Sequence, residues 1–378
     1  MKFISFTEVS IPQQILKNCK ILSRYKNFST DGIFSKKCSL YFEKTLNVPK
    51  ALMTKSCTSA LEMCAILLNI KEGDEIIFPS YAYVSTINAF VLRGAKPIFV
   101  DIDANNLNID VMQLEKKINK KTKAIVIINY AGGSCEISKI IKLKKKHNIY
   151  LIEDNAHSLF SKYRNKYLGT FGDLSVTSFH QTKNLHCGEG GALFINNKKF
   201  IKRASIIFKK GTDKQKFLEK KVKKYSWKDL GSSFELSEIH SYILFHCLKD
   251  WKTKFKKRMK IWLNYHEKLL ILEKKNYLKR PIFVRSIKHN AHIYYILVKK
   301  NYRDSMISYL NQNKINATFH YLPQHESDFF KKNYKEKFNL QISKKISDQI
   351  IRLPISNNLK KEQFDHIIKY IFKFFLTK

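Results

Sequence analysis

Three short apolar runs in the middle third of the chain, each with a polar residue at or near its end, constrain the fold most. They are KPIFVDI at 96–102, KAIVIIN at 123–129 and YLIED at 150–154. Strands with near-continuous Val and Ile content, separated by helical stretches such as 137–148, are typical of a parallel sheet covered on both faces. Ligands bind beyond the carboxyl ends of such strands. Asp101, Asn129 and Asp154 therefore predict a site at that edge.

The pattern changes after about residue 234. Apolar residues from Leu236 to Trp262 recur every three or four positions, which predicts one long helix over 234–270, with room for a bend. Short strands and helices follow. We therefore expect an α/β protein with a large domain over 1–250, including the N-terminal segment, and a smaller C-terminal α+β domain over 251–378.

Composition narrows the functional class. The 378 residues carry a formal net charge of +39, but the lysines are spread along the whole chain, which favours compositional drift over a nucleic-acid-binding surface. No apolar run is long enough to span a membrane, the N-terminus does not resemble a secretory signal, and the seven cysteines match no disulfide or zinc pattern. A cytoplasmic protein is expected.

Lys183 is the main candidate for chemistry. It lies in SFHQTKN at 178–184, followed by GEGG at 188–191. A Schiff-base lysine needs a fixed position and surroundings that favour its neutral amine, and glycines let the backbone approach a ligand closely. Taken alone, any lysine of this chain is more often a surface group, so the context decides.

Four other places in the chain provide that context. Asp154 could keep a pyridine nitrogen protonated, which makes the ring of pyridoxal phosphate an electron sink; a solvated loop carboxylate is the alternative. The residues 56–59 precede a helical stretch and could cap it or bind a phosphate, with Ser178 adding a hydroxyl. Tyr83 could stack on a planar cofactor or lie in the core. His157 could lie near the same ring or cap a helix.

Six segments, in order, carry a family resemblance. They are SCTSALEM, PSYAYVSTINAFVLRGAKPIFVDID, INYAGGSCEI, LIEDNAHSL, SFHQTKNLHCGEGGAL and FHYLPQH, within residues 31–359. Together they resemble the DegT/DnrJ/EryC family of sugar aminotransferases, which has the aspartate-aminotransferase fold (type I). The resemblance implies pyridoxal 5'-phosphate as cofactor, L-glutamate as amino donor, and a homodimer with shared active sites.

Residue roles follow from the resemblance by position. Lys183 would be the Schiff-base lysine and the proton shuttle, and Asp154 would hold the pyridine nitrogen. Ser233 stands where many relatives carry an asparagine that reaches the partner subunit's phosphate. The residues implied to bind the cofactor are Asp154, His157, Tyr83, Cys57, Thr58, Ser178, Lys183 and Ser233. The residues implied to bind the sugar nucleotide are His320, Tyr321, His325 and Asp31. No metal site is predicted, because no ligand cluster accompanies the histidines.

The segments KGTDKQKF, KYSWKDLGSSFELSEI and NAHIYYILV resemble the branch of the family that makes dTDP-4-amino-4,6-dideoxygalactose. This implies dTDP-4-dehydro-6-deoxy-D-glucose as substrate and a role in making a surface glycan such as enterobacterial common antigen or lipopolysaccharide. A transaminase acting at C3 or on another nucleotide keto-sugar stays open, as does a catalytically inactive basic binding protein of the same fold. A sugar dehydratase is disfavoured, because those relatives carry histidine in place of the lysine.

Overall fold

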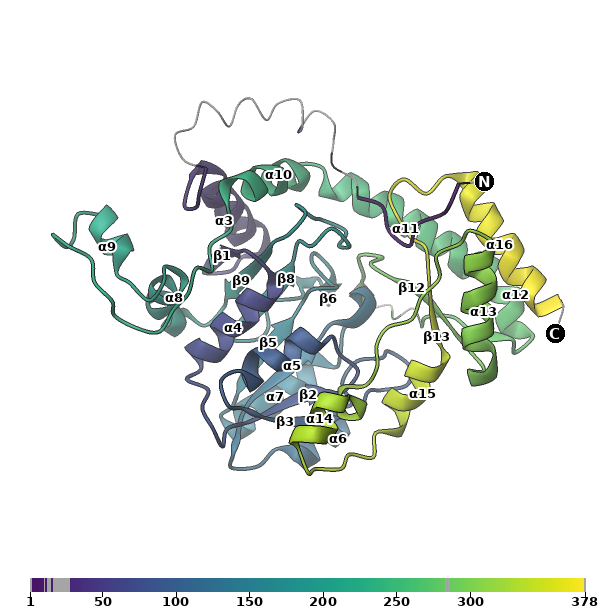
Figure 1. The fold of residues 1–378 in the computed structure, drawn as a ribbon, viewed down its shortest axis with the longest axis horizontal. Helices are drawn as coiled ribbons and strands as arrows, with labels where there is room; N and C mark the ends of the chain where they lie inside the picture. The colour runs from purple at the N-terminus through teal and green to yellow at the C-terminus, as the bar shows by residue number, and fades with distance from the viewer. Residues whose placement is uncertain are drawn as a thin grey trace.

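A seven-stranded sheet forms the centre of the molecule (Figure 1). The structure is a computed structural model, and it describes residues 2–9, 11, 15, 28–282, 284 and 286–376. The strand order is β1-β9-β8-β5-β4-β2-β3. The strands are β1 (Lys50–Thr54), β2 (Glu75–Pro79), β3 (Lys96–Val100), β4 (Thr122–Ile128), β5 (Tyr150–Asp154), β8 (Leu174–Ser178) and β9 (Gly191–Ile195). From β8 to β3 all neighbours are parallel, and β9 is antiparallel to both of its neighbours. The predicted α/β class with a mostly parallel sheet is confirmed.

Both faces of the sheet are buried, as the continuous apolar strands require. On β4, Ala124, Val126 and Ile128 pack into the core that contains α4 and α5, while Ile125 and Ile127 pack into the core that contains α6 and α7. The helices are α4 (Cys57–Leu67), α5 (Val84–Val91), α6 (Val111–Lys117) and α7 (Ile137–His147). A third core packs α3 (Ile33–Leu46) and α10 (Glu238–Leu248) against β1 and β9.

The single long helix predicted over 234–270 is wrong in its extent. The chain up to Leu236 is extended beside β1, where the Leu236 amide donates to the Met53 carbonyl at 3.0 Å. The Ser237 side chain then caps α10 by accepting from the His240 amide. A break follows before α11 (Trp251–Lys268) and α12 (Leu270–Lys274). Apolar periodicity continues through the break because α10 and α11 each bury one face, so spacing alone does not reveal where a helix ends.

The C-terminal lobe is the expected α+β unit. Its antiparallel sheet consists of β10 (Leu278–Lys279), β12 (Tyr294–Val298) and β13 (Ile350–Leu353), and α11, α12, α13 (Lys300–Gln312) and α16 (Lys361–Leu376) pack on it. Ile4 lies in this core, and its amide donates to the Lys314 carbonyl at 2.8 Å. Residues 2–9 therefore lie beside the C-terminal lobe (Figure 1), although the predicted division counts them with 1–250. That division falls between α10 and α11 and stays a prediction.

The remaining elements lie at the edges. The short strands β6 (Lys162–Tyr163), β7 (Lys166–Tyr167) and β11 (Ile287–Lys288) form a small sheet that joins the two lobes. The helices α8 (Ile201–Phe208) and α9 (Lys214–Leu218) lie on the side of the molecule away from the C-terminal lobe (Figure 1). The helices α14 (Asp328–Asn333) and α15 (Gln341–Gln349) cover the β3 side. None of the helices that the structure describes is long and apolar enough to cross a membrane.

Asp101, one of the three polar run ends, has a structural role. Its carboxylate accepts from the Ile342 amide at 2.9 Å, the Ser343 amide at 2.7 Å and the Ser343 hydroxyl at 2.6 Å. These groups form the first turn of α15, whose amides have no partner within the helix. Asp101 is 3% exposed. The acid therefore joins β3 to a helix some 240 residues later in the chain.

We predict that Asp101→Asn lowers the free energy of unfolding by about 2 kcal/mol, because it removes a buried charged acceptor from three donors. The measurement is urea denaturation followed by circular dichroism. Asp304→Asn, at a side chain that is 79% exposed, is the matched control. Equal denaturation midpoints for the two variants would contradict the assignment.

Candidate active site

A cavity of about 410 Å³ lies at the carboxyl ends of β5 and β8, with walls from both lobes. Most of the residues that the sequence analysis selected meet in it. These are Cys57, Thr58, Tyr83, Asp154, His157, Ser178, Lys183, His320 and Tyr321. The sheet brings the first turn of α4, the end of β5 and the loop after β8 to one edge, as its topology requires. His320 and Tyr321 reach the same cavity from the C-terminal lobe.

Lys183 lies in the loop that joins β8 to β9, and this loop is anchored at several points. The Phe179 amide donates to the Gly190 carbonyl at 2.7 Å, and the Gln181 amide donates to the Gly188 carbonyl at 2.8 Å. The neighbouring Asn184 side chain bonds the Asn290 carbonyl at 2.8 Å and the His292 ring at 2.9 Å. The lysine is therefore fixed by contacts with both lobes.

The amine of Lys183 is easier to deprotonate than that of an ordinary lysine. Burial lowers its pKa from 10.5 to about 8, and the positive charge of Arg352 acts in the same direction. The negative charge of Asp154 opposes this effect without cancelling it. A sizeable fraction of the amine is neutral near physiological pH, which is the form that attacks a carbonyl carbon.

Asp154 occupies the end of β5 and faces the same cavity. It is 5% exposed, and its carboxylate accepts from the Thr86 hydroxyl at 2.7 Å and from the Ala156 amide at 3.1 Å. Burial raises the pKa of this carboxyl, while the bond from Thr86 lowers it. The preceding acid, Glu153, points to the other side of the strand and accepts from the amides of Gly169, Phe171 and Gly172. Strand alternation therefore separates a structural acid from the one that faces the cavity.

The first turn of α4 can hold a phosphate. The Ser56 side chain caps the helix by accepting from the Ser59 amide at 3.0 Å, and Cys57 and Thr58 then present helix-terminal amides at the cavity. Gly191 packs against this turn so closely that an added Cβ would lie 2.4 Å from the Cys57 nitrogen. Steric exclusion of a side chain therefore explains why the last residue of GEGG is a glycine.

An aromatic cluster lines the remaining wall. The Tyr321 hydroxyl bonds His157 Nε2 at 3.2 Å, and the Tyr83 and Tyr321 rings lie 6.0 Å apart. The Nδ1 atom of His157 is buried without a hydrogen-bond partner in the described chain. Burial holds the pKa of His157 well below its ordinary value, so this ring is neutral.

These residues fit a phosphorylated pyridine aldehyde. The cavity offers a partly neutral amine for the aldehyde, a buried carboxylate for the ring nitrogen, helix-terminal amides for the phosphate and a polar ring atom without a partner. No group of three or more His, Cys, Asp or Glu side chains that could hold a metal ion occurs within the described ranges.

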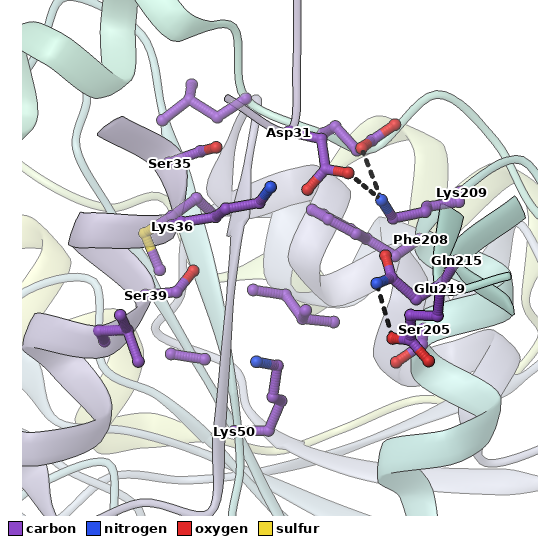
Figure 2. A pocket seen from close by; sticks show the side chains of 16 residues that line it. Asp31, Ser35, Lys36, Ser39, Lys50, Ser205, Phe208, Lys209, Gln215 and Glu219 are labelled. Atoms are coloured by element: carbon purple, nitrogen blue, oxygen red, sulfur yellow. Dashed lines mark hydrogen bonds and ion pairs between the residues drawn. The ribbon is translucent and has the colours of Figure 1, made fainter. Parts of the chain in front are cut away.

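Three predicted residues lie outside this cavity. Asp31 lines a second cavity of about 400 Å³, where it pairs with Lys209 at 2.5 Å, as Figure 2 shows. Ser233 is exposed and pairs with Lys209 through a β-bridge, so it lies near Asp31. His325 is buried and its Nδ1 atom bonds the Ser80 hydroxyl at 2.7 Å. Within a single chain these three do not face Lys183.

The profile of the DegT/DnrJ/EryC1/StrS aminotransferase family matches residues 10–372 of the chain. The chain belongs to this family. A UDP-4-amino-4,6-dideoxy-N-acetyl-beta-L-altrosamine transaminase of Helicobacter pylori is 33% identical over 354 residues, which are 90% of each protein. A GDP-perosamine synthase of Escherichia coli O157:H7 is 28% identical over 352 residues, 93% of this chain and 92% of the relative.

Solved structures agree with the family assignment. PseC, an aminotransferase of pseudaminic acid biosynthesis in Helicobacter pylori, superposes with a TM-score of 0.91 at 28% identity over the whole of both chains. A sugar aminotransferase of Streptococcus pneumoniae, in its pyridoxal phosphate form, has the same fold, with a TM-score of 0.90 at 22% identity, 99% of each chain covered. The protein is thus a type I aminotransferase that uses pyridoxal phosphate and acts on nucleotide sugars.

Sequence reasoning missed several members of this aminotransferase site, among them Thr86, Arg352, His292 and Phe6. Thr86 follows Tyr83 within the resembling segment PSYAYVST and could have been found by its helical spacing. Arg352, His292 and Phe6 line the cavity from the C-terminal lobe and the N-terminal segment. They lie 109 to 177 residues from Lys183, and no local pattern connects them to it.

We predict that Lys183→Met stabilises the cofactor-free protein by about 1 to 2 kcal/mol near pH 7. The pKa of Lys183 is lower in the folded chain than in the unfolded chain, so the unfolded chain binds more protons between pH 8 and 10.5. The stability of the wild type therefore rises with pH across this interval, and the advantage of the variant shrinks. Denaturation at about pH 7 and about pH 10 measures this, with the exposed Lys145→Met as control. A pH-independent difference would refute the shift.

Proposed function

We propose that this enzyme transfers the amino group of L-glutamate to C4 of dTDP-4-dehydro-6-deoxy-D-glucose, giving dTDP-4-amino-4,6-dideoxy-D-galactose. The observation that carries the proposal is the shared cavity of Lys183 and Asp154, in which burial lowers the pKa of the amine to about 8. An inactive basic binding protein would have no need to keep a lysine in such surroundings, because burying the charge costs stability.

Pyridoxal phosphate, when bound, supplies the aldehyde that carries the amino group between the two substrates and the ring that accepts electrons. Lys183 would hold the aldehyde at rest and, once released, accept and return the proton at the reacting carbon. Asp154, held by Thr86, would keep a proton on the ring nitrogen. Cys57, Thr58 and Ser178 would hold the phosphate at the first turn of α4.

The assignment of the sugar rests on the resembling segments KGTDKQKF, KYSWKDLGSSFELSEI and NAHIYYILV. The name of the Helicobacter pylori relative describes a 4-amino-4,6-dideoxy product, which supports amination at C4. That relative and the perosamine synthase are named for UDP and GDP sugars. A UDP-linked 4-keto-sugar is therefore the second candidate substrate, and the test below includes it.

We further propose a homodimer in the cytoplasm that supplies a surface glycan such as enterobacterial common antigen. Asp31 and Ser233, both proposed to serve a ligand, both lie beside Lys209, and neither lines the Lys183 cavity of its own chain. This arrangement supports a dimer in which their side of one subunit faces the cavity of the other. Such an isologous contact would place both sites at one interface.

Purified enzyme with L-glutamate is expected to aminate dTDP-4-dehydro-6-deoxy-D-glucose at C4, and NMR of the product identifies the position and its stereochemistry. The UDP- and GDP-linked 4-keto-sugars are tested in parallel, and the highest kcat/KM identifies the nucleotide. Lys183→Ala is expected to lose the visible colour of bound pyridoxal phosphate and at least about 1,000-fold in turnover. Lys145→Ala serves as control. A colourless wild type that ignores both substrates would overturn the proposal.

Mixed dimers test the shared site. Lys183→Ala disables one site, while Ser233→Asp places a negative charge where the partner's cofactor phosphate would bind. Co-refolded, the two inactive variants are expected to regain about a quarter of wild-type activity, because half of the dimers contain one intact site. Activity is first measured on the unseparated mixture; the mixed dimer isolated on orthogonal affinity tags is then expected to show about half of wild-type activity. If the mixture stays inactive while each variant still dimerises, Ser233 serves no partner site.

A further inference from the structure

A second buried histidine lies beside Lys183, in the wall that the C-terminal lobe adds to the cavity. His292 lies just before β12, is 4% exposed and lines the same cavity as Lys183. Burial and the nearby His157 and Lys183 hold the pKa of His292 well below its ordinary value, so the ring is neutral. One ring nitrogen of a neutral histidine carries a hydrogen, and the other offers a lone pair. The position of that hydrogen decides what the ring can bind.

Neighbouring amide groups decide which nitrogen carries the hydrogen. Nδ2 of Asn184 donates to the Asn290 carbonyl at 2.8 Å, so the Oδ1 atom of Asn184 faces His292. An amide oxygen can only accept a hydrogen bond. Nδ1 of His292, which lies 2.9 Å from this oxygen, therefore carries the hydrogen, and Nε2 is left as an acceptor. The Asn290 side chain is fixed as well, because it donates to the carbonyls of His157 at 3.0 Å and Leu159 at 3.1 Å.

The Nε2 atom of His292 is available to a ligand. It has no hydrogen-bond partner within the part of the chain that the structure describes, and its ring lines the cavity. Nδ1 of His157 also lacks a described partner but is fully buried, whereas Nε2 of His292 is accessible from the cavity. A fixed acceptor of this kind binds an O–H or N–H group and does not bind a carbonyl or ether oxygen. A ligand that reaches His292 therefore needs a donor at that point.

We propose that Nε2 of His292 accepts a hydrogen bond from the 3-hydroxyl group of the keto-sugar. The inference rests on the proposed function, because it needs a 4-keto-sugar whose C4 lies beside Lys183. In such a sugar the 3-hydroxyl is attached to the carbon next to C4, which makes it the nearest donor to the reacting carbon. The ring oxygen and the 6-methyl group donate no hydrogen bond. Asn184 directly follows Lys183 and bonds His292, which places the histidine ring beside the lysine.

Two amines are the other donors near this nitrogen. The amine of Lys183 is close enough for its charge to lower the pKa of His292, but no hydrogen bond joins the two side chains in the described structure. The amino group of L-glutamate is the group that is transferred, so it leaves any fixed partner during the reaction. The 3-hydroxyl of the sugar is unchanged by the reaction and can keep one partner throughout. The hydroxyl therefore fits a fixed acceptor better than either amine.

A pair of sugars tests the contact. The wild type is expected to aminate the 4-keto-sugar nucleotide with a kcat/KM about 10- to 100-fold higher than that for its 3-deoxy analogue, because the analogue leaves a buried acceptor unpaired. His292→Phe keeps an aromatic ring without nitrogen and is expected to lose this preference. The preference is a ratio between two sugars, so an effect of the variant on Lys183 that is common to both sugars cancels. His289→Phe, at a half-buried histidine that does not line the cavity, is the matched control and is expected to keep the preference.

The position of the hydrogen on His292 has a readout of its own, which needs no activity. Nitrogen NMR of the histidine-labelled holoenzyme is expected to show a protonated Nδ1 and an unprotonated Nε2 for this residue. The signal is assigned by its loss in His292→Gln. A protonated Nε2 would overturn the proposal, whatever the sugar preference.

The remaining outcomes separate this contact from the proposed function. If the wild type aminates both sugars equally well, or if His292→Phe keeps the preference, the enzyme remains a 4-keto-sugar aminotransferase but the contact is overturned. An equal loss for both sugars in His292→Phe, with a slower reaction of the coloured enzyme with L-glutamate alone, would show that the ring acts only on Lys183 through Asn184, and it too would overturn the contact. If the wild type aminates no 4-keto-sugar, the proposed function fails and the contact fails with it.

Discussion

Exclusion of water from the amine of Lys183 is the interaction on which the active site depends. The negative charge of Asp154 attracts the protonated form, yet burial and the charge of Arg352 favour the neutral one more strongly. The balance requires walls on every side of the lysine, and these come from the sheet edge, the first turn of α4 and the C-terminal lobe. The fold is therefore part of the chemistry, because no single segment could desolvate the amine.

Acidic side chains are scarce in this chain, and several of them serve as internal acceptors. Glu238 of α10 accepts from the amides of Phe34 and Ser35 at the start of α3, a helix with no capping side chain of its own. Asp101 has the same relation to α15, and Glu153 binds three amides beside β5. With these acids buried, much of the surplus of Lys and Arg has no acidic partner on the surface.

The sequence predicted the parts of the fold that depend on local pattern. Apolar runs located β3, β4 and β5 to within two residues, and the ends of strands located Asp154. The family resemblance added the prediction that Lys183, Cys57 and Thr58 belong to one site, and all three line one cavity. Periodicity could not locate the break between α10 and α11, because burial continues on both sides of it.

Other features depend on contacts between distant segments and left no local signal. Asp101 was expected at a ligand-binding edge but caps a helix about 240 residues away. In the sequence, Arg352 is one of 70 Lys and Arg residues, and only its position in the cavity wall distinguishes it from the others. Asp31 and Ser233 lie together outside the cavity, a neighbourhood that depends on the β-bridge at Lys209.

Because the cavity walls belong to two lobes, the basicity of Lys183 is thermodynamically linked to how closely those lobes pack. Any separation at the seam formed by Tyr321, His320 and Phe6 would admit water and let the amine take up a proton. Substitutions in the core of the C-terminal lobe, far from any ligand, can therefore move the pH at which the enzyme works. In this protein, the rigidity of the contact between the lobes and the pKa of Lys183 therefore depend on the same packing.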